Sequence, residues 1–221
     1  MIDNFDKIRE HLKFDKPGDF YVAHIMIRGK DIPDEQKKIF REDHQSGLLV
    51  KTYYADSLAY FDKKKPAMID LAEKNHARVY IIPTRKNRIV TNRIIAKKVI
   101  EYIDDPNVRY DHLIRSAVCG CHISDYKWWV LDVDNDTEII DPYNIGPLSK
   151  VRLYDIKDDV VSEMARLVDE TKTRSGSEIY ELPTKNGCHI LTPPFNRSEL
   201  SFLGDNLKTD GMTLLYYNDG E

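Results

Sequence analysis

The segment that decides the fold runs from residue 128 to residue 134 and reads WWVLDVD. Its apolar run is typical of a strand, and the strand leads into two aspartates. Downstream, the apolar spacing and an Asn-Gly turn predict a helix, two strands, a short helix and a last strand. These elements are expected at residues 158–172, 178–182, 188–192, 197–203 and 213–217. Apart from a short strand-like insertion, the second half of the chain therefore follows the order β-α-β-β-α-β.

This order is that of the ferredoxin-like, or RRM-like, fold, and it predicts an α+β protein. In that fold the third strand lies beside the first and runs antiparallel to it. The end of the strand with Asp132 and Asp134 should then lie beside the start of the strand with His189. We therefore expect these three side chains to converge at one edge of one sheet, although they are far apart in the sequence.

The first half of the chain predicts an α/β unit. Strands are expected at residues 20–27 and 77–83, and Pro83 should close the second of them. A helix is expected with Pro66 in its first turn. The spacing of isoleucine and valine over residues 94–103 predicts a further helix.

The length of 221 residues and the mass of 25.8 kDa suit one domain or two closely packed halves. We assign residues 1–115 to an N-terminal α/β half with a basic loop and residues 116–221 to the RRM-like module, packed as one compact unit. Hydrophobic residues make up 41% of the chain, which is enough for a core. The net charge of −4 argues against a globally basic nucleic-acid binder, but it allows a local basic face.

The sequence also bears on location. No stretch approaches the roughly 18 apolar residues that span a bilayer. The acidic N-terminus lacks the basic and apolar regions of a signal peptide. Three cysteines are too few for a disulfide framework. We therefore expect a soluble cytoplasmic protein without a membrane partner.

Asp132 and Asp134 are two positions apart on a strand, so their carboxylates should point to the same face. Such a pair suits Mg²⁺ or Mn²⁺, because these ions use one or two protein carboxylates together with water and substrate phosphates. Two such ions about 4 Å apart support in-line attack at phosphorus. His189 would contact a nucleotide phosphate or position the attacking group. Residues 134–136, Asp-Asn-Asp, also fit an ordinary turn, and this alternative stays open.

Two segments resemble motifs of the archaeo-eukaryotic primase, or primase-polymerase, superfamily. Residues 129–134, WVLDVD, are similar to its first motif, and residues 184–189, TKNGCH, are similar to its second. The resemblance covers about residues 128–219. It implies an RRM-like catalytic core that makes primers or extends DNA from nucleoside triphosphates. It also implies that the two aspartates hold divalent metal and that His189 touches the triphosphate.

The superfamily has a third acidic motif, an apolar strand followed by an acidic residue. Asp219 follows such a strand in this chain. The expected topology, however, places the start of the last strand, near Asp210, at the edge that carries the other two acids. The third metal ligand is therefore Asp210, Asp219 or none. With none, the protein would be a non-catalytic relative.

Basic residues follow the strand that ends at Pro83. Arg85, Lys86 and Arg88 are expected in a loop that would track a template backbone or hold triphosphate. A solvated basic loop is the alternative. Lys185, within the second motif, is a further candidate for nucleotide or nucleic-acid binding. The strand ARVYI at residues 77–81 and the basic loop resemble small phage and prophage proteins, which suggests no activity.

The first functional hypothesis is a metal-dependent nucleotidyltransferase of primase-polymerase type. It would act on DNA or RNA with nucleoside triphosphates and would use Mg²⁺ or Mn²⁺ as cofactor. A replication protein such as a helicase is a possible partner. One alternative is a non-catalytic relative that binds nucleic acid or nucleotide. The other alternative is a metal-dependent phosphodiesterase or nuclease that uses the same acidic edge.

Overall fold

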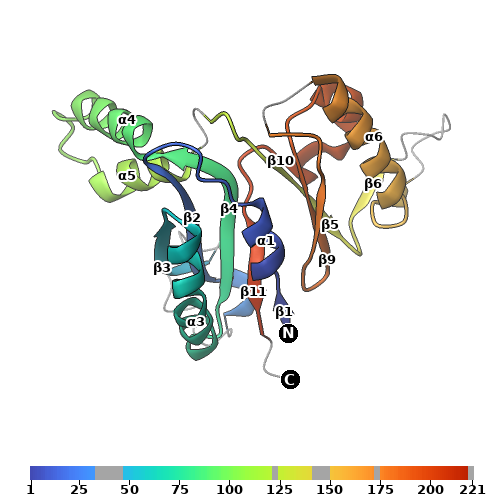
Figure 1. Ribbon diagram of the computed structural model, residues 1–221, viewed down its shortest axis with the longest axis horizontal. Coiled ribbons are helices and arrows are strands. Elements are labelled where there is room, and N and C mark those ends of the chain that lie inside the picture. Colours follow the sequence, from blue (N-terminus) through green and yellow to red (C-terminus); the bar gives the residue numbers. More distant parts are fainter. Residues whose placement is uncertain (33–46, 121–123, 141–149, 172–174, 219–221) are drawn as a thin grey trace.

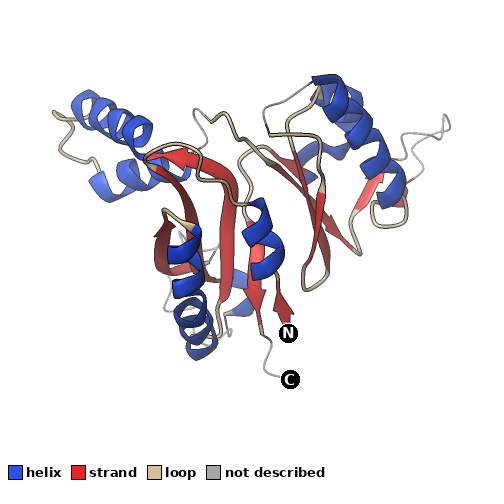
Figure 2. Ribbon diagram, in the orientation of Figure 1, coloured by secondary structure: helices blue, strands red, loops and turns tan. Residues whose placement is uncertain are grey.

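The computed structural model describes residues 1–32, 47–120, 124–140, 150–171 and 175–218. Its helices and mostly antiparallel sheets make the protein α+β, as expected (Figures 1 and 2). In these ranges, one sheet has the strand order β1-β11-β4-β2-β3, formed by β1 (Ile2–Asp3), β11 (Thr213–Tyr217), β4 (Arg78–Asn87), β2 (Asp19–Ile27) and β3 (Leu48–Ala55). A second has the order β10-β5-β9-β8, formed by β10 (Leu207–Lys208), β5 (Trp129–Asp134), β9 (Gly187–Thr192) and β8 (Tyr180–Pro183). A two-stranded sheet pairs β6 (Glu138–Ile140) with β7 (Lys150–Arg152).

Helices pack on both large sheets. The helices of the described ranges are α1 (Phe5–His11), α3 (Leu58–Lys74), α4 (Arg88–Glu101), α5 (Tyr110–Cys119) and α6 (Lys157–Thr171), with the 3₁₀ segments η1 (Gly29–Asp31) and η3 (Arg197–Asn206). Figure 1 shows α1 between the two large sheets, α6 on the outer side of the four-stranded sheet, and α4 beside α5. None of these described helices is long and apolar enough to cross a membrane.

The helix expected to begin near Pro66 begins much earlier. α3 starts at Leu58, and Pro66 lies in its interior. The cause is a local cap, because the Ser57 hydroxyl accepts a hydrogen bond from the backbone N–H of Tyr60 at 3.1 Å. The side chain of Phe61 then faces the core, which fixes the first turn. The start of this helix is therefore set by a cap rather than by the proline.

The prediction of a basic loop after Pro83 is wrong. β4 continues through Pro83 to Asn87, and α4 begins at once with Arg88. The pairing of β4 with β2 has a register shift around Pro83, so the proline lies in an irregular part of the ladder and costs little there. β2 supplies partners for the end of the strand, and the Asn87 side chain caps α4 by accepting from the N–H of Ile89 at 3.1 Å.

The last expected strand joins a different sheet. Residues 213–217 do form a strand, but this β11 pairs with β4 and β1 of the five-stranded sheet. The free edge of β5 is instead paired by the short strand β10. The chain crosses between the sheets at Gly211, where an added Cβ would lie 2.9 Å from the Cβ of Val130. All five residues of β11 are buried, so apolar contact in the first sheet decides where this strand pairs.

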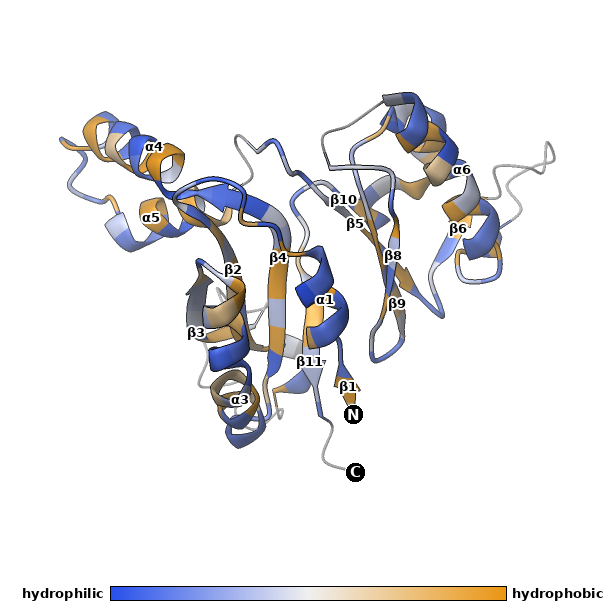
Figure 3. Cartoon of the chain, in the orientation of Figure 1, coloured by the Kyte–Doolittle hydropathy of each residue, from blue (hydrophilic) through white to orange (hydrophobic). Residues whose placement is uncertain are grey.

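The two large sheets share one hydrophobic cluster. Val130 of β5 and Leu191 of β9 belong to the same cluster as Ile81 of β4 and Leu215 of β11. The opposite face of the four-stranded sheet packs against α6 and η3 in a second cluster. Figure 3 shows the hydrophobic colouring of the central strands that meet in these clusters. The four-stranded sheet is therefore covered on both faces, and the two sheets pack together.

His11 at the end of α1 joins the two sheets. Its Nε2 lies 3.1 Å from the carbonyl oxygen of Pro83, and its ring centroid is 4.3 Å from that of Trp128 in an edge-on contact. Burial lowers the pKa of His11 to about 4, so the ring is neutral at pH 7. The contact with Pro83 then requires the tautomer that carries the proton on Nε2.

Gly187 brings β9 close to β5 beside the two aspartates. It follows the expected Asn-Gly turn, it pairs with Asp134, and its carbonyl oxygen accepts from the N–H of Thr184 at 2.9 Å. A Cβ at this position would lie 2.0 Å from the carbonyl oxygen of Val133, which is backbone and cannot rotate away. Only glycine allows this separation between the two strands.

We predict that Gly187→Ala lowers the free energy of unfolding by about 1–3 kcal/mol, because the strands must separate to admit the methyl group. Chemical denaturation of both proteins measures the change. Asn186→Ala, at the neighbouring exposed turn position, is the control and should change stability much less. Equal stability of Gly187→Ala and the unmodified protein would contradict the close approach.

Candidate functional site

The register of β5 and β9 brings Asp132 and His189 together. The two residues are direct cross-strand partners, and Asp132 Oδ1 lies 3.4 Å from His189 Nε2. His189 Nδ1 lies 3.1 Å from the hydroxyl oxygen of Thr213, at the start of β11. The expected meeting of the end of one strand with the start of its neighbour is confirmed.

The other oxygen of Asp132 has a cationic partner. Lys208 of β10 donates from Nζ to Asp132 Oδ2 at 2.8 Å. The hydrogen bond from His189 and then that from Lys208 hold the pKa of Asp132 well below its usual range, although burial acts in the opposite direction. Asp132 is therefore a carboxylate at any pH near neutrality.

Asp134 lies on the same face of β5 as Asp132, as the alternation of the strand requires. Its side chain is half-buried, and no ion pair joins it to another residue of the described ranges. The backbone after it is fixed, because the N–H of Asn135 donates to the carbonyl oxygen of Asn186 at 2.8 Å. Asp134 thus offers an anionic group whose position is set by the two strands.

These side chains line a small pocket between the two large sheets. Asp132, Asp134, His189 and Lys185 come from the four-stranded sheet and its β8–β9 turn. The five-stranded sheet supplies the opposite wall, and the pocket has a volume of about 50 Å³. The lining residues on that side are Arg78 and Tyr80 of β4, Leu214 of β11 and Arg28, which directly follows β2. Residues from both halves of the chain therefore build one site.

The opposite wall is basic. Arg78 donates from Nε and Nη2 to the two carboxylate oxygens of Asp31, each at 2.8 Å, and its guanidinium lies 4.5 Å from the ring centroid of Tyr217. Lys185 donates to the Tyr217 hydroxyl at 2.9 Å. Arg28 donates to the Tyr80 hydroxyl at 3.3 Å. The pocket thus combines an acidic pair with three cations, of which Arg28 and Arg78 lie on the opposite wall and Lys185 lies on the β8–β9 turn beside the pair.

Sequence reasoning missed Arg28 and Arg78. Arg78 is the first residue of an apolar strand and Arg28 follows another. Charged residues are common at the ends of buried strands, so neither position indicates a functional site. Their approach to Asp132 and Asp134 depends on how the two sheets pack, which no local pattern encodes. A charged residue with almost no exposed side chain, as Arg78 has at 6%, is visible only in the fold.

The donor set fits a hard divalent ion in part. Among the described residues, no group of three or more His, Cys, Asp or Glu side chains is arranged to hold a metal. Mg²⁺ and Mn²⁺ need fewer protein ligands, because they take the rest from water and substrate phosphates. Asp132 and Asp134, on one face and at one pocket, supply the two carboxylates such an ion commonly uses. Asp210 is exposed and does not line the pocket, and Asp219 lies outside the described residues.

The other basic candidates lie elsewhere. Arg85 and Lys86 are at the opposite end of β4 from Arg78, about 23 Å or more away at roughly 3.3 Å per residue, and Arg88 follows them at the start of α4. Lys86 donates from Nζ to the carbonyl oxygen of Cys119 at 3.0 Å. Arg88 is paired with Asp56 at 3.0 Å at the protein surface. These three residues line other cavities than the one with Asp132.

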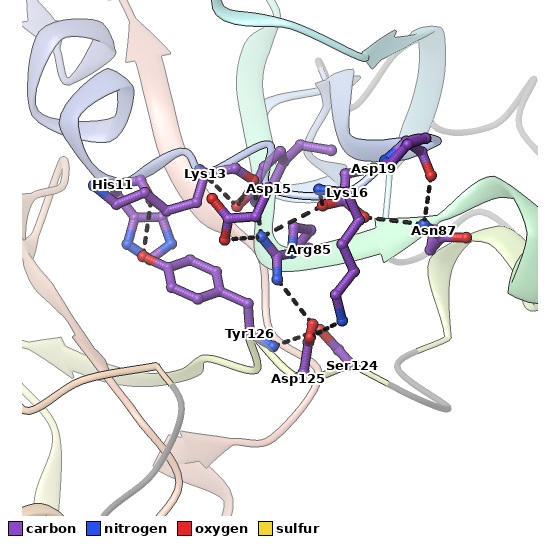
Figure 4. Close-up of polar contacts among 12 residues, drawn as sticks. His11, Lys13, Asp15, Lys16, Asp19, Arg85, Asn87, Ser124, Asp125 and Tyr126 are labelled. Atoms are coloured by element: carbon purple, nitrogen blue, oxygen red, sulfur yellow. Dashed lines mark hydrogen bonds and ion pairs between the residues drawn. The ribbon is translucent and has the colours of Figure 1, made fainter.

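Arg85 is a buried structural cation. Figure 4 shows its guanidinium among three carboxylates, with Asp15 at 2.6 Å, Asp125 at 2.8 Å and Asp19 at 3.4 Å. Burial lowers the pKa of Arg85, but the hydrogen bonds to Asp125 and Asp15 outweigh it and raise the pKa. Lys16 also pairs with Asp125. The network joins the segment before β2, the end of β4 and the segment that leads into β5, so Arg85 is not available to nucleic acid.

We predict that Arg85→Met lowers the free energy of unfolding by about 3 kcal/mol, because it leaves carboxylates facing a buried, uncharged side chain. Arg85→Lys should recover only part of this, since an ammonium cannot match several acceptors in one plane. Arg88→Met, which removes an exposed pair, is the control with an expected change below about 0.5 kcal/mol. Chemical denaturation of all three variants measures these changes. If Arg85→Met leaves the free energy of unfolding unchanged, the structural role of Arg85 is wrong.

No family model, no curated protein and no solved structure matches this chain.

Proposed function

We propose that the protein is a metal-dependent nucleotidyltransferase of primase-polymerase type that acts on DNA or RNA with nucleoside triphosphates. The observation that carries the proposal is the pocket that brings Asp132 and Asp134 together with Arg28, Arg78 and Lys185. A nucleoside triphosphate with a divalent ion carries negative charge on its phosphates and positive charge on the ion. Its phosphates suit the basic wall, and its metal suits the carboxylates.

The topology of the four-stranded sheet supports the same proposal. The order β10-β5-β9-β8, with α6 between β5 and β8 and with η3 between β9 and β10, is compatible with an RRM-like module. The two segments that resemble the superfamily's motifs are β5 and the β8–β9 turn, and they lie side by side. The module would end with β10 rather than with the expected strand at residues 213–217.

Each side chain has a defined part in such a reaction. When bound, Mg²⁺ or Mn²⁺ would supply charge neutralisation at the reacting phosphate. Asp132 and Asp134 would hold the ion. His189, held by Thr213 at Nδ1, would exchange the contact of its Nε2 with Asp132 for a phosphate oxygen or for the attacking hydroxyl. Lys185 and Arg28 would stabilise the charge of the outer phosphates.

Nucleic acid would need a further basic surface. With Arg85 buried, the exposed cations near that end of the molecule include Arg88, Arg93 and Lys97 of α4. These side chains are suited to contacts with a phosphate backbone. A replication partner and a cytoplasmic location remain part of the proposal.

A second function is favoured by one observation. In the described residues, Asp132 is paired with Lys208 and no third carboxylate lines the pocket. This favours a relative that binds nucleotide or nucleic acid without catalysis. A metal-dependent phosphodiesterase or nuclease would use the same acidic pair, and it is separated from the others by its products.

Primer extension tests the proposal directly. We predict extension of a primed template with labelled nucleotides in Mn²⁺ or Mg²⁺, and a loss of more than about 100-fold in Asp132→Ala and in Asp134→Ala, because loss of a metal ligand should exceed the effect of changing an outer-shell partner. Asp136→Ala, an exposed acid in the turn after β5, is the matched control and should keep full activity.

The outcomes separate the three functions. Extension activity retained in both aspartate variants would overturn the proposal that the protein is a nucleotidyltransferase with this site. Nucleotide binding without extension by the unmodified protein would support the non-catalytic relative. Cleavage of the primer or template that depends on Asp132 and Asp134 would support the phosphodiesterase or nuclease.

A further inference from the structure

Both carboxylate oxygens of Asp132 already have a partner in this structure. Oδ1 faces His189 Nε2 at 3.4 Å, and Oδ2 accepts from Lys208 Nζ at 2.8 Å. Asp134, one step further along the same face, has no ion pair with a residue of the described ranges. One member of the acidic pair is therefore occupied by a cation of the chain, and the other is open.

The backbone holds Lys208 at this place. β10 is a two-residue strand in which Leu207 pairs with Leu131 and Lys208 pairs with Val130 of β5. The Leu207 side chain is 2% exposed and anchors the strand in the cluster under α6 and η3. The Lys208 side chain is 50% exposed, so its ammonium reaches Asp132 from the solvent side.

A lysine on an edge strand often serves only to prevent pairing with another chain. That role needs a charge that points into water. Here the ammonium instead reaches the neighbouring strand β5, where it contacts a carboxylate of the pocket two positions beyond its partner Val130. The flexible four-carbon stem also allows the ammonium to leave without a change in the backbone.

We propose that Lys208 is an internal competitor for the metal site, whose ammonium occupies Asp132 Oδ2 and must leave before a divalent ion binds both carboxylates. This inference rests on the proposed metal-dependent function. The ammonium reduces the net charge of the acidic pair from −2 to −1, which weakens its attraction for a free divalent ion. Metal would then bind best together with a triphosphate, whose oxygens complete its coordination and whose charge is met by Arg28 and Lys185.

The experiment measures Mn²⁺ binding to the full chain by electron paramagnetic resonance, which reports the free ion. Lys208→Met keeps an unbranched side chain that is one atom shorter and removes its charge. We expect it to bind Mn²⁺ about tenfold more tightly than the unmodified protein, as loss of one nearby charge at a partly exposed site implies. Lys208→Glu, which adds a third carboxylate, should bind more tightly still.

Two further variants serve as controls. Lys150→Met removes an exposed lysine that pairs with Glu138 on the separate two-stranded sheet, and it should not change the affinity. Asp132→Asn should weaken Mn²⁺ binding both alone and combined with Lys208→Met. This combination shows that the gained affinity belongs to the Asp132 site.

The results distinguish the inference from the function on which it rests. If Lys208→Met binds Mn²⁺ no more tightly than the unmodified protein while Asp132→Asn still weakens binding, the metal site stands and the competitor role is wrong. If none of the proteins binds Mn²⁺ at millimolar concentration, the metal site itself is wrong, and both proposals fail together.

Discussion

The site depends on the pairing of β5 with β9 in one register. This register places Asp132 opposite His189 and Asp134 opposite Gly187. A slip by one residue would turn both aspartates into the cluster that packs on α6, where unpaired carboxylates are strongly unfavourable. The absence of a side chain at Gly187 allows β9 to approach β5 closely. The buried residues that alternate with the aspartates along β5 keep both aspartates on the same face of the strand. The acidic pair is thus positioned by the same contacts that stabilise the sheet.

The second requirement is the packing of the two sheets. The last strand, β11, returns to the five-stranded sheet and carries Leu214 to the pocket and Tyr217 between Arg78 and Lys185. The basic wall is therefore held by residues from opposite ends of the chain. At the other end of β4, the buried guanidinium of Arg85 ties together the segments that enter each sheet. The charged groups of β4 thus have different tasks, with Arg78 at the pocket and Arg85 in the framework.

Local patterns predicted the parts of the site that are local. The apolar run before Asp132 and the Asn-Gly turn before His189 each indicate a strand, and the order of elements indicates that the strands are neighbours. The sequence could not predict that residues 213–217 leave this sheet, because an apolar strand fits either sheet and only the total burial decides. Nor could it identify Arg28, whose approach to the aspartates follows from tertiary packing. Pro83 was misleading because a register shift in the β2–β4 ladder accommodates it.

The proposed function requires that one pocket bind a divalent ion through Asp132 and Asp134 and phosphates through Arg28 and Lys185. A crystal structure with Mn²⁺ and a non-hydrolysable nucleoside triphosphate tests it most directly, with diffraction data collected near the manganese absorption edge. We expect an anomalous peak in contact with Asp132 and Asp134, and phosphates that face Arg28 and Lys185. A nucleotide bound elsewhere, or a pocket that contains neither ion nor phosphate at saturating ligand, would contradict it.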